Sequence, residues 1–162
     1  MIKIFYMDST DILINIRKIV RSINLESKRI QKDYGVSIPQ VLCLNYLSKA
    51  PGSQASQSEI KGFLNLNSST VSGIIQRLEK KGMIARLPKN GDKRVTNLIL
   101  TAPGERLLRQ VPPLLHDRLN IKLLRIDEPE LMNIEKVLEQ LVDMLQISEI
   151  EAAPLITNEI EL

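Results

Sequence analysis

The side chains best suited to chemistry in this 162-residue chain are hydrogen-bonding groups at helical spacing between residues 68 and 78. Apolar residues recur there at i, i+3, i+4 and i+7, which predicts one buried stripe: Val71, Ile74, Ile75 and Leu78. The opposite face has hydroxyl, amide and guanidinium groups: Ser68, Ser69, Thr70, Ser72, Gln76 and Arg77. Because no bulky apolar side chain interrupts it, this face could approach the major groove of duplex DNA. There Arg77 could pair with guanine and Gln76 with adenine, or either could hold a phosphate.

A second group of candidate residues lies in a basic segment that follows this helix. Residues 83–87 and 95–100 predict two short strands, and Asn-Gly at 90–91 is a strong hairpin signal because both residues tolerate positive φ. The tip holds Lys89, Lys93 and Arg94 against the single carboxylate of Asp92. The alternative is an ordinary solvated hairpin, but its place directly after a polar-faced helix favours a wing that lies along DNA phosphates.

The elements before and after the polar helix have clear boundary signals. Ser56 and Glu59 have the spacing of a capping box, so a helix begins at 56 and continues through apolar residues to Leu64. A turn at 65–67 follows, and Asn67 or Ser68 caps the polar helix, which ends at Gly82. Helix, turn, helix and charged hairpin in this order predict a winged helix-turn-helix.

About 50 residues of this region resemble the MarR family of bacterial transcription regulators. The family pattern is matched by the run Arg-Leu-Glu-Lys-Lys-Gly at 77–82, Arg86, Asp-Lys-Arg at 92–94 and Leu-Thr-Ala-Pro-Gly at 100–104. The resemblance implies a homodimer that binds a pseudo-palindromic operator, usually as a repressor. It also implies that Arg94 reaches a minor groove while Asp92 supports it, and that a small-molecule effector could tune binding, although no charged or aromatic cluster identifies one.

The flanking sequences predict further helices. One starts at Asp8 or Ser9 and ends by Gly35, and the next runs from Ser37 to Ala50. Thr101 caps a helix that the prolines at 112–113 interrupt, and helical sequence resumes over 115–124. A last helix starts at 127, with the seam Leu131, Ile134, Leu138, Leu141 and Leu145 at 3-4 spacing.

This seam could pack against another subunit or be buried within its own chain, and we favour dimerisation because the first helix also has an apolar stripe. The expected division is an N-terminal dimerisation helix in 1–36, a DNA-binding domain in 37–101 and C-terminal dimerisation helices in 102–147. The acidic tail in 148–162 fits either disorder or a segment that lies over the partner. The fold class is therefore mainly α with a small β-hairpin wing.

Charge is distributed unevenly along the chain. Residues 1–126 contain 21 Lys or Arg and 9 Asp or Glu, whereas residues 127–162 contain 1 and 10, so +12 and −9 give the net +3. The basic part suits a polyphosphate partner and includes the helix-turn-helix. No apolar run approaches the roughly 18 residues of a membrane span, and the apolar start is too short for a signal peptide, so we expect a cytoplasmic protein.

No catalytic or metal-binding set emerges, so we expect neither an enzyme nor a cofactor. His116 is the only histidine and Cys43 the only cysteine, which together cannot form a transition-metal site. We interpret His116 as a helical surface or interface residue and Cys43 as a small apolar residue rather than a redox sensor. The function predicted is a sequence-specific DNA-binding transcription regulator. The alternative is a winged-helix protein–protein adaptor, which would favour an apolar or acidic face on the second helix.

Overall fold

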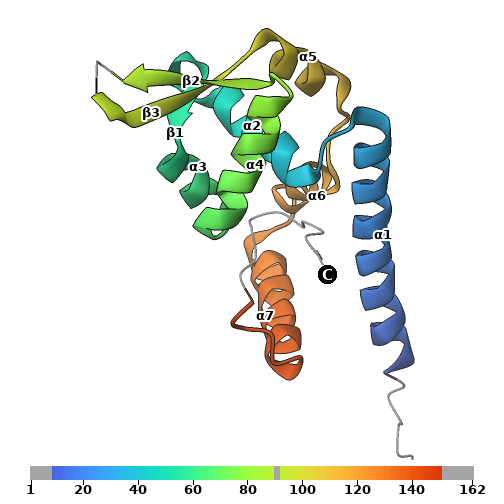
Figure 1. Ribbon diagram of the computed structural model, residues 1–162. Coiled ribbons are helices and arrows are strands. Elements are labelled where there is room, and N and C mark those ends of the chain that lie inside the picture. The colour runs from blue at the N-terminus through green and yellow to red at the C-terminus, as the bar shows by residue number, and fades with distance from the viewer. Residues whose placement is uncertain (1–8, 90–91, 151–162) are drawn as a thin grey trace, which may run out of the picture.

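The computed structural model describes residues 9–89 and 92–150, except for the side chains of 88–96. A lobe contains α2 (Ile38–Lys49), α3 (Gln57–Leu64), α4 (Ser68–Lys80), α5 (Ala102–Gln110) and a small sheet (Figure 1). The helices α1 (Thr10–Tyr34) and α7 (Glu128–Met144) extend from the same side of this lobe, and α6 (Leu115–Leu123) links α5 to α7. The expected mainly helical fold with a β-hairpin is confirmed. In the described part of the chain, no helix is long and apolar enough to cross a membrane.

The helix boundaries follow from the capping residues expected from the sequence. Helix α1 begins after Ser9 and ends at Gly35, whose φ of 70° is the left-handed conformation that glycine adopts at little cost. At the start of α2 the Ser37 amide donates to Gln40 Oε1 at 2.9 Å. In α7 the side chain of Asp127 accepts a hydrogen bond from the Glu130 amide at 3.0 Å. Each of these contacts satisfies a backbone group that a helix end leaves unpaired.

The sheet has three antiparallel strands in the order β1-β3-β2, where the sequence predicted only two. The additional strand β1 (Gln54–Ser56) follows a 3₁₀ turn, η1 (Pro51–Ser53), and pairs with the inner end of β3 (Asp92–Leu100). The hairpin strands are also longer than predicted, because β2 (Ile84–Lys89) pairs with β3 as far as Lys89 opposite Asp92. Pro88 is tolerated because β2 is an edge strand, where a missing amide costs little.

The core is aliphatic and lies between α2, α4 and the sheet. Helix α2 crosses the middle of the lobe, with eight of its residues buried. The predicted stripe on α4 is confirmed, because Val71, Ile74, Ile75 and Leu78 are each 0% exposed. Since these four residues face inward, the remaining side chains of α4 are directed away from the core.

The start of α5 is fitted closely against the end of α4. The Thr101 hydroxyl donates to the Gly82 carbonyl at 2.6 Å, and the Thr101 amide donates to the Met83 carbonyl at 3.1 Å. A Cβ at Gly104 would overlap the Met83 carbonyl oxygen and lie 2.6 Å from Leu100 Cδ1. The Leu-Thr-x-x-Gly sequence therefore builds a junction in which threonine binds the preceding turn and glycine leaves room for its backbone.

The helices outside the lobe leave most of their apolar side chains exposed. In α1 only Ile30 is buried, whereas Ile19 is 55% and Val20 50% exposed. No residue of α7 is buried, and Leu138 is 52% exposed. The alternative that the seam of α7 is buried within its own chain is therefore wrong for the described residues. A polar contact does connect α1 to α6, because the Leu115 amide donates to Glu26 Oε1 at 2.7 Å.

Candidate nucleic-acid interface

The two helices of the helix-turn-helix are joined by asparagines that set the start of α4. Asn65 ends α3 in the left-handed conformation at φ 50°, which asparagine tolerates better than most residues. Asn67 then caps α4, its Oδ1 accepting from the Thr70 amide at 2.8 Å and from the Ser69 hydroxyl at 2.6 Å. The same Ser56–Glu59 capping box that the sequence predicted fixes the start of α3, with the Ser56 amide donating to Glu59 Oε2 at 2.7 Å.

The structure brings the predicted candidates of α4 together on one accessible surface. Five of them are exposed: Ser68, Ser69, Ser72, Gln76 and Arg77. Thr70 is half-buried, and its amide is used by the cap. The hydroxyl of Ser72 already donates to the Ser68 carbonyl at 2.8 Å and accepts from Gln57 Nε2 at 2.7 Å. The serines therefore supply a polar surface of fixed geometry, whereas Gln76 extends further from the helix.

Gln57 is a residue that the sequence analysis did not identify. It lies in the first turn of α3, and its side-chain amide reaches across the turn to Ser72 on α4. This bond fixes the spacing of the two helices at the edge of the polar surface. Gln57 lies between the two capping-box residues Ser56 and Glu59, at a position where a solvent-facing residue is usual. The sequence around it therefore gives no sign that its side chain contacts another helix.

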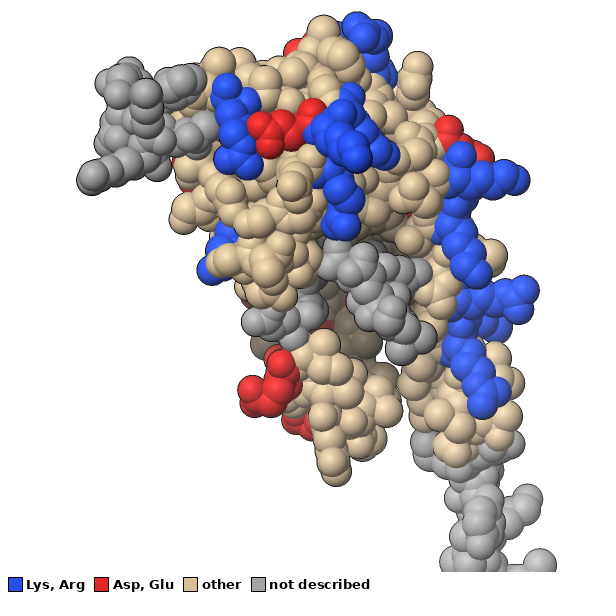
Figure 2. Space-filling view, viewed as in Figure 1, with Lys and Arg blue, Asp and Glu red and all other residues tan. Residues whose placement is uncertain are grey.

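Two cations near the end of α4 are used within the protein. The Lys81 ammonium donates to the Gly35 carbonyl at the end of α1. The Arg86 guanidinium, on β2, pairs with the Glu79 carboxylate at 3.0 Å. Figure 2 shows Lys and Arg around this end of α4 and along the outer side of α1. Part of the positive charge near the end of α4 therefore holds α1 and β2 in place. A count of basic residues alone would have assigned all of this charge to contacts with phosphates.

The predicted wing is present as a hairpin that projects from the lobe (Figure 1). Its backbone is described up to Lys89 and from Asp92 onward. The side chains of Lys89, Asp92, Lys93 and Arg94 lie outside the described part, so their roles stay predictions. The register still places Lys89 and Asp92 opposite each other next to the tip.

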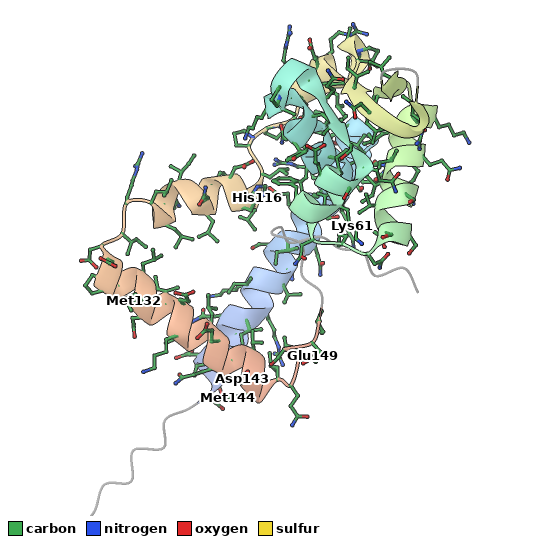
Figure 3. All side chains as sticks on the ribbon, turned by 90° about the vertical axis from the view of Figure 1, so that its left-hand side faces the viewer. Lys61, His116, Met132, Asp143, Met144 and Glu149 are labelled. Atoms are coloured by element: carbon green, nitrogen blue, oxygen red, sulfur yellow. The ribbon has the colours of Figure 1, made fainter. Side chains whose placement is uncertain are left out.

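Cys43 and His116 occupy environments of different kinds. Cys43 is fully buried in α2, and burial raises the pKa of its thiol to about 12. His116 lies where α6 leaves the lobe (Figure 3), and its Nε2 is 3.0 Å from Asp117 Oδ1. Burial lowers the His116 pKa, while the carboxylates of Asp117 and Glu26 oppose that shift. Among the described residues, no three His, Cys, Asp or Glu side chains are grouped so as to hold a metal ion.

Replacing Cys43 with serine is expected to lower the free energy of unfolding by about 1–3 kcal/mol, because the change transfers a hydroxyl from water into a fully buried apolar site. A thiol with so high a pKa forms almost no reactive thiolate, so peroxide should affect wild type and Cys43→Ser equally. Denaturant titration measures the change in stability. DNA affinity before and after peroxide treatment measures the sensitivity to oxidation. Peroxide release of the wild type alone would show that Cys43 is a redox sensor.

Comparison with known proteins agrees with this architecture. The MarR family model matches residues 36–96. The chain is 28% identical over 101 residues to the uncharacterized HTH-type transcriptional regulator YsmB of Bacillus subtilis, covering 62% of this chain and 68% of that protein. It is 25% identical over 107 residues to the HTH-type transcriptional repressor Rv2887 of Mycobacterium tuberculosis, covering 66% and 76%.

Solved structures share the fold over most of the chain. The MarR family regulator Sco3205 of Streptomyces coelicolor, solved in complex with DNA, superposes with a TM-score of 0.60 at 22% identity, covering 86% of this chain and 94% of that one. The MepR–DNA complex of S. aureus gives 0.61 at 21% identity, covering 80% and 94%. The matched segment begins just after α1, ends within β3 and contains α4 with its polar outer face. The chain is therefore similar to MarR family regulators in the segment that contains its winged helix-turn-helix.

Proposed function

We propose that this protein is a sequence-specific DNA-binding transcription regulator that acts as a homodimeric repressor on a pseudo-palindromic operator in the cytoplasm. The observation that carries the proposal is the outer face of α4. Five polar candidates are exposed there, while the four apolar residues of the same helix are completely buried. A helix that presents only short or hydrogen-bonding groups beside a projecting hairpin has the shape and chemistry to enter a major groove.

In this function the residues of α4 have two roles. Gln76 reads a base edge, with adenine as the base that best fits its amide, and Arg77 binds guanine or a phosphate. Ser68, Ser69, Thr70 and Ser72 line the approach to the groove. In the wing, Lys89 and Lys93 contact phosphates, while Asp92 orients Arg94 toward a minor groove.

The remaining parts of the chain supply dimerisation and a place for an effector. Residues 1–36 and 102–147 form the dimerisation region around the DNA-binding domain of 37–101. A cavity of about 290 Å³ lies between α2, α5 and α6, where the lobe meets this region. Its size suits a small molecule bound between the dimerisation helices and the lobe. The repressor name of the mycobacterial relative and the DNA in two neighbouring structures support the proposal.

The test is a DNA selection followed by a salt series. The purified protein should enrich a two-fold symmetric site from a randomised duplex pool. On that site Arg94→Ala should weaken binding markedly, while Lys93→Ala should reduce the salt slope by about one unit per subunit. Gln76→Ala should change the preferred sequence more than the affinity for random DNA.

The adaptor alternative predicts a different result. If no site is enriched and Arg94→Ala binds operator and random duplexes as wild type does, the hairpin is not a DNA-contacting wing. Lys61→Ala provides a matched control (Figure 3). Lys61 is an exposed cation on α3 that we assign neither to the outer face of α4 nor to the wing.

A further inference from the structure

Ser72 of α4 is exposed beside the start of α3, and two hydrogen bonds fix the direction of its hydroxyl proton. The hydroxyl donates to the Ser68 carbonyl at 2.8 Å, and this carbonyl can only accept. The same hydroxyl oxygen lies 2.7 Å from the side-chain amide of Gln57 on α3. Because the single proton of Ser72 is already used, the Gln57 atom that faces it must be the donor Nε2. Ser72 therefore donates within its own helix and accepts from the neighbouring one.

The bond from Gln57 distinguishes Ser72 from an ordinary helical serine. Ser48, near the end of α2, is also exposed and donates to a carbonyl of its own helix, that of Asn45, at 2.8 Å. Among the described residues no side chain donates to Ser48, so its hydroxyl can rotate away by breaking one bond. For Ser72 the same rotation would break two bonds, one of them to a different helix. Ser72 is therefore held in one rotamer.

These two bonds leave Ser72 able to accept a further hydrogen bond but not to donate one. A hydroxyl oxygen has two lone pairs, and the bond from Gln57 uses one of them. Phosphate oxygens are themselves acceptors and cannot bind the lone pair that remains. In the major groove guanine presents the acceptors N7 and O6 and thymine the acceptor O4, whereas adenine N6 and cytosine N4 carry amino groups that donate. The hydrogen bonds around Ser72 therefore select an exocyclic amino group.

Gly73, next to Ser72, allows the backbone of α4 to come close to such a group. Glycine inside a helix is less favourable than alanine. Packing gives no reason for it here, because a Cβ added at Gly73 would meet only Arg77 Nη2, at 3.8 Å. Gly73 lies about 150° around the helix from the centre of the buried stripe, on the face that is free to enter the groove. A side chain as short as serine reaches a base edge only where the helix backbone itself comes near the base.

We propose that Ser72 recognises an exocyclic amino group, adenine N6 or cytosine N4, as a hydrogen-bond acceptor in the major groove, and that Gln57 is the positioning residue that holds it in this role. The proposal deepens the proposed function and rests on the DNA-binding face of α4. It separates Ser72 from Gln76 and Arg77, which lie further along the helix and carry groups able to donate. The preference at one base of each half-site therefore comes from a contact between α3 and α4.

The first test removes one amino group at a time from the operator obtained by selection. Purine in place of adenine lacks the N6 amino group, and the pyrimidinone analogue of cytosine lacks the N4 amino group, so the two arms identify the base. At the position that Ser72 contacts, this loss should weaken wild-type binding about 3- to 10-fold per half-site more than it weakens binding of Ser72→Ala. Comparing the two proteins cancels the effect of the analogue on the duplex itself. Ser48→Ala is the matched control and should respond as wild type does, whereas equal responses of wild type and Ser72→Ala at every position would overturn the proposal.

The second test removes the donor that holds Ser72. Gln57→Met keeps a side chain of similar length but cannot donate, so the Ser72 hydroxyl becomes free to rotate and to donate to guanine or thymine as well. The preference for the amino-bearing base at that one position should fall about 3- to 10-fold, while the affinity for random duplex stays as in wild type. Circular dichroism checks that the variant is folded. An unchanged base preference would overturn the assignment of Gln57 as the positioning residue.

The third test concerns the approach of α4 to the groove. Gly73→Ala should raise the denaturant midpoint, because alanine favours the helix, and yet weaken operator binding roughly 10-fold or more, because its methyl group holds the backbone away from the base. Gly62→Ala, on α3, is the control and should raise the midpoint without changing operator binding. Unchanged operator affinity of Gly73→Ala would contradict the close approach on which Ser72 depends. Selection that enriches no site would contradict the proposed function itself, whereas an enriched site at which no amino group couples to Ser72 contradicts only this proposal.

Discussion

Leu138→Glu is expected to convert the protein to a monomer at micromolar concentration and to reduce operator binding by at least 100-fold. In a single chain Leu138 is 52% exposed, so a glutamate there leaves the fold of that chain almost unaffected. In a dimer whose subunits pack through the apolar seam of α7, the same glutamate places an unpaired charge in an apolar contact. This weakens dimerisation by several kcal/mol. Because both subunits carry the change, each dimer contains it twice.

Sedimentation equilibrium and operator binding measure the two effects, and thermal unfolding verifies that the lobe remains folded. Gln140→Glu introduces the same charge on the opposite side of α7 and should leave dimer mass and affinity unchanged. If Leu138→Glu keeps the dimer mass of wild type, α7 does not form the subunit interface. Loss of operator binding without loss of dimer would instead place α7 near the DNA.

The second large effect is expected from Gly104→Ala, which should lower the free energy of unfolding by about 3 kcal/mol. The added methyl group would overlap the Met83 carbonyl oxygen, and a backbone carbonyl cannot rotate away as a flexible side chain does. Relief requires α5 to move away from the end of α4. That movement would also lengthen the two hydrogen bonds by which Thr101 holds residues 82–83.

Gly62→Ala is the control for this prediction. Gly62 lies in α3, and a Cβ added there would meet no heavy atom within 4 Å, so alanine should stabilise the helix by about 0.5–1 kcal/mol. Denaturant titrations at one protein concentration compare both variants with wild type. Equal stability of Gly104→Ala and wild type would mean that the junction between α4 and α5 is looser than the structure indicates.

Local signals were sufficient to predict most helices. Capping residues such as Ser37, Asn67 and Asp127 mark helix starts through bonds to groups three residues away, which sequence spacing reveals directly. The polar outer face of α4 was predictable for the same reason, because one helical period separates buried from exposed positions. The strand β1 was not predicted, because three residues are too short for an alternating pattern and their pairing partner lies more than 40 residues away.

Tertiary contacts account for the other differences. The ammonium of Lys81, directly after α4, binds the carbonyl of Gly35 at the end of α1, a contact between distant residues that no local pattern in the sequence indicates. Gly104 belongs to a recognisable motif, but the sequence does not show why a glycine is required there. The requirement comes from the Met83 carbonyl, which leaves no room for a Cβ and lies close to Gly104 only in the folded chain. Gln57 and Arg86 likewise acquire their partners, Ser72 and Glu79, only when separate elements pack together.

The exposed apolar faces of α1 and α7 link this protein's stability to its abundance. The lobe has its own aliphatic core, whereas these two helices bury few side chains in a single chain. In the proposed dimer, association supplies most of the free energy that orders these helices, and mass action makes that contribution grow with protein concentration. At low concentration the proposed dimer dissociates and exposes both apolar faces to proteases and chaperones, whereas at high concentration the partner subunit covers them. For the proposed repressor, cellular copy number would therefore set both the occupancy of the operator and the lifetime of the protein.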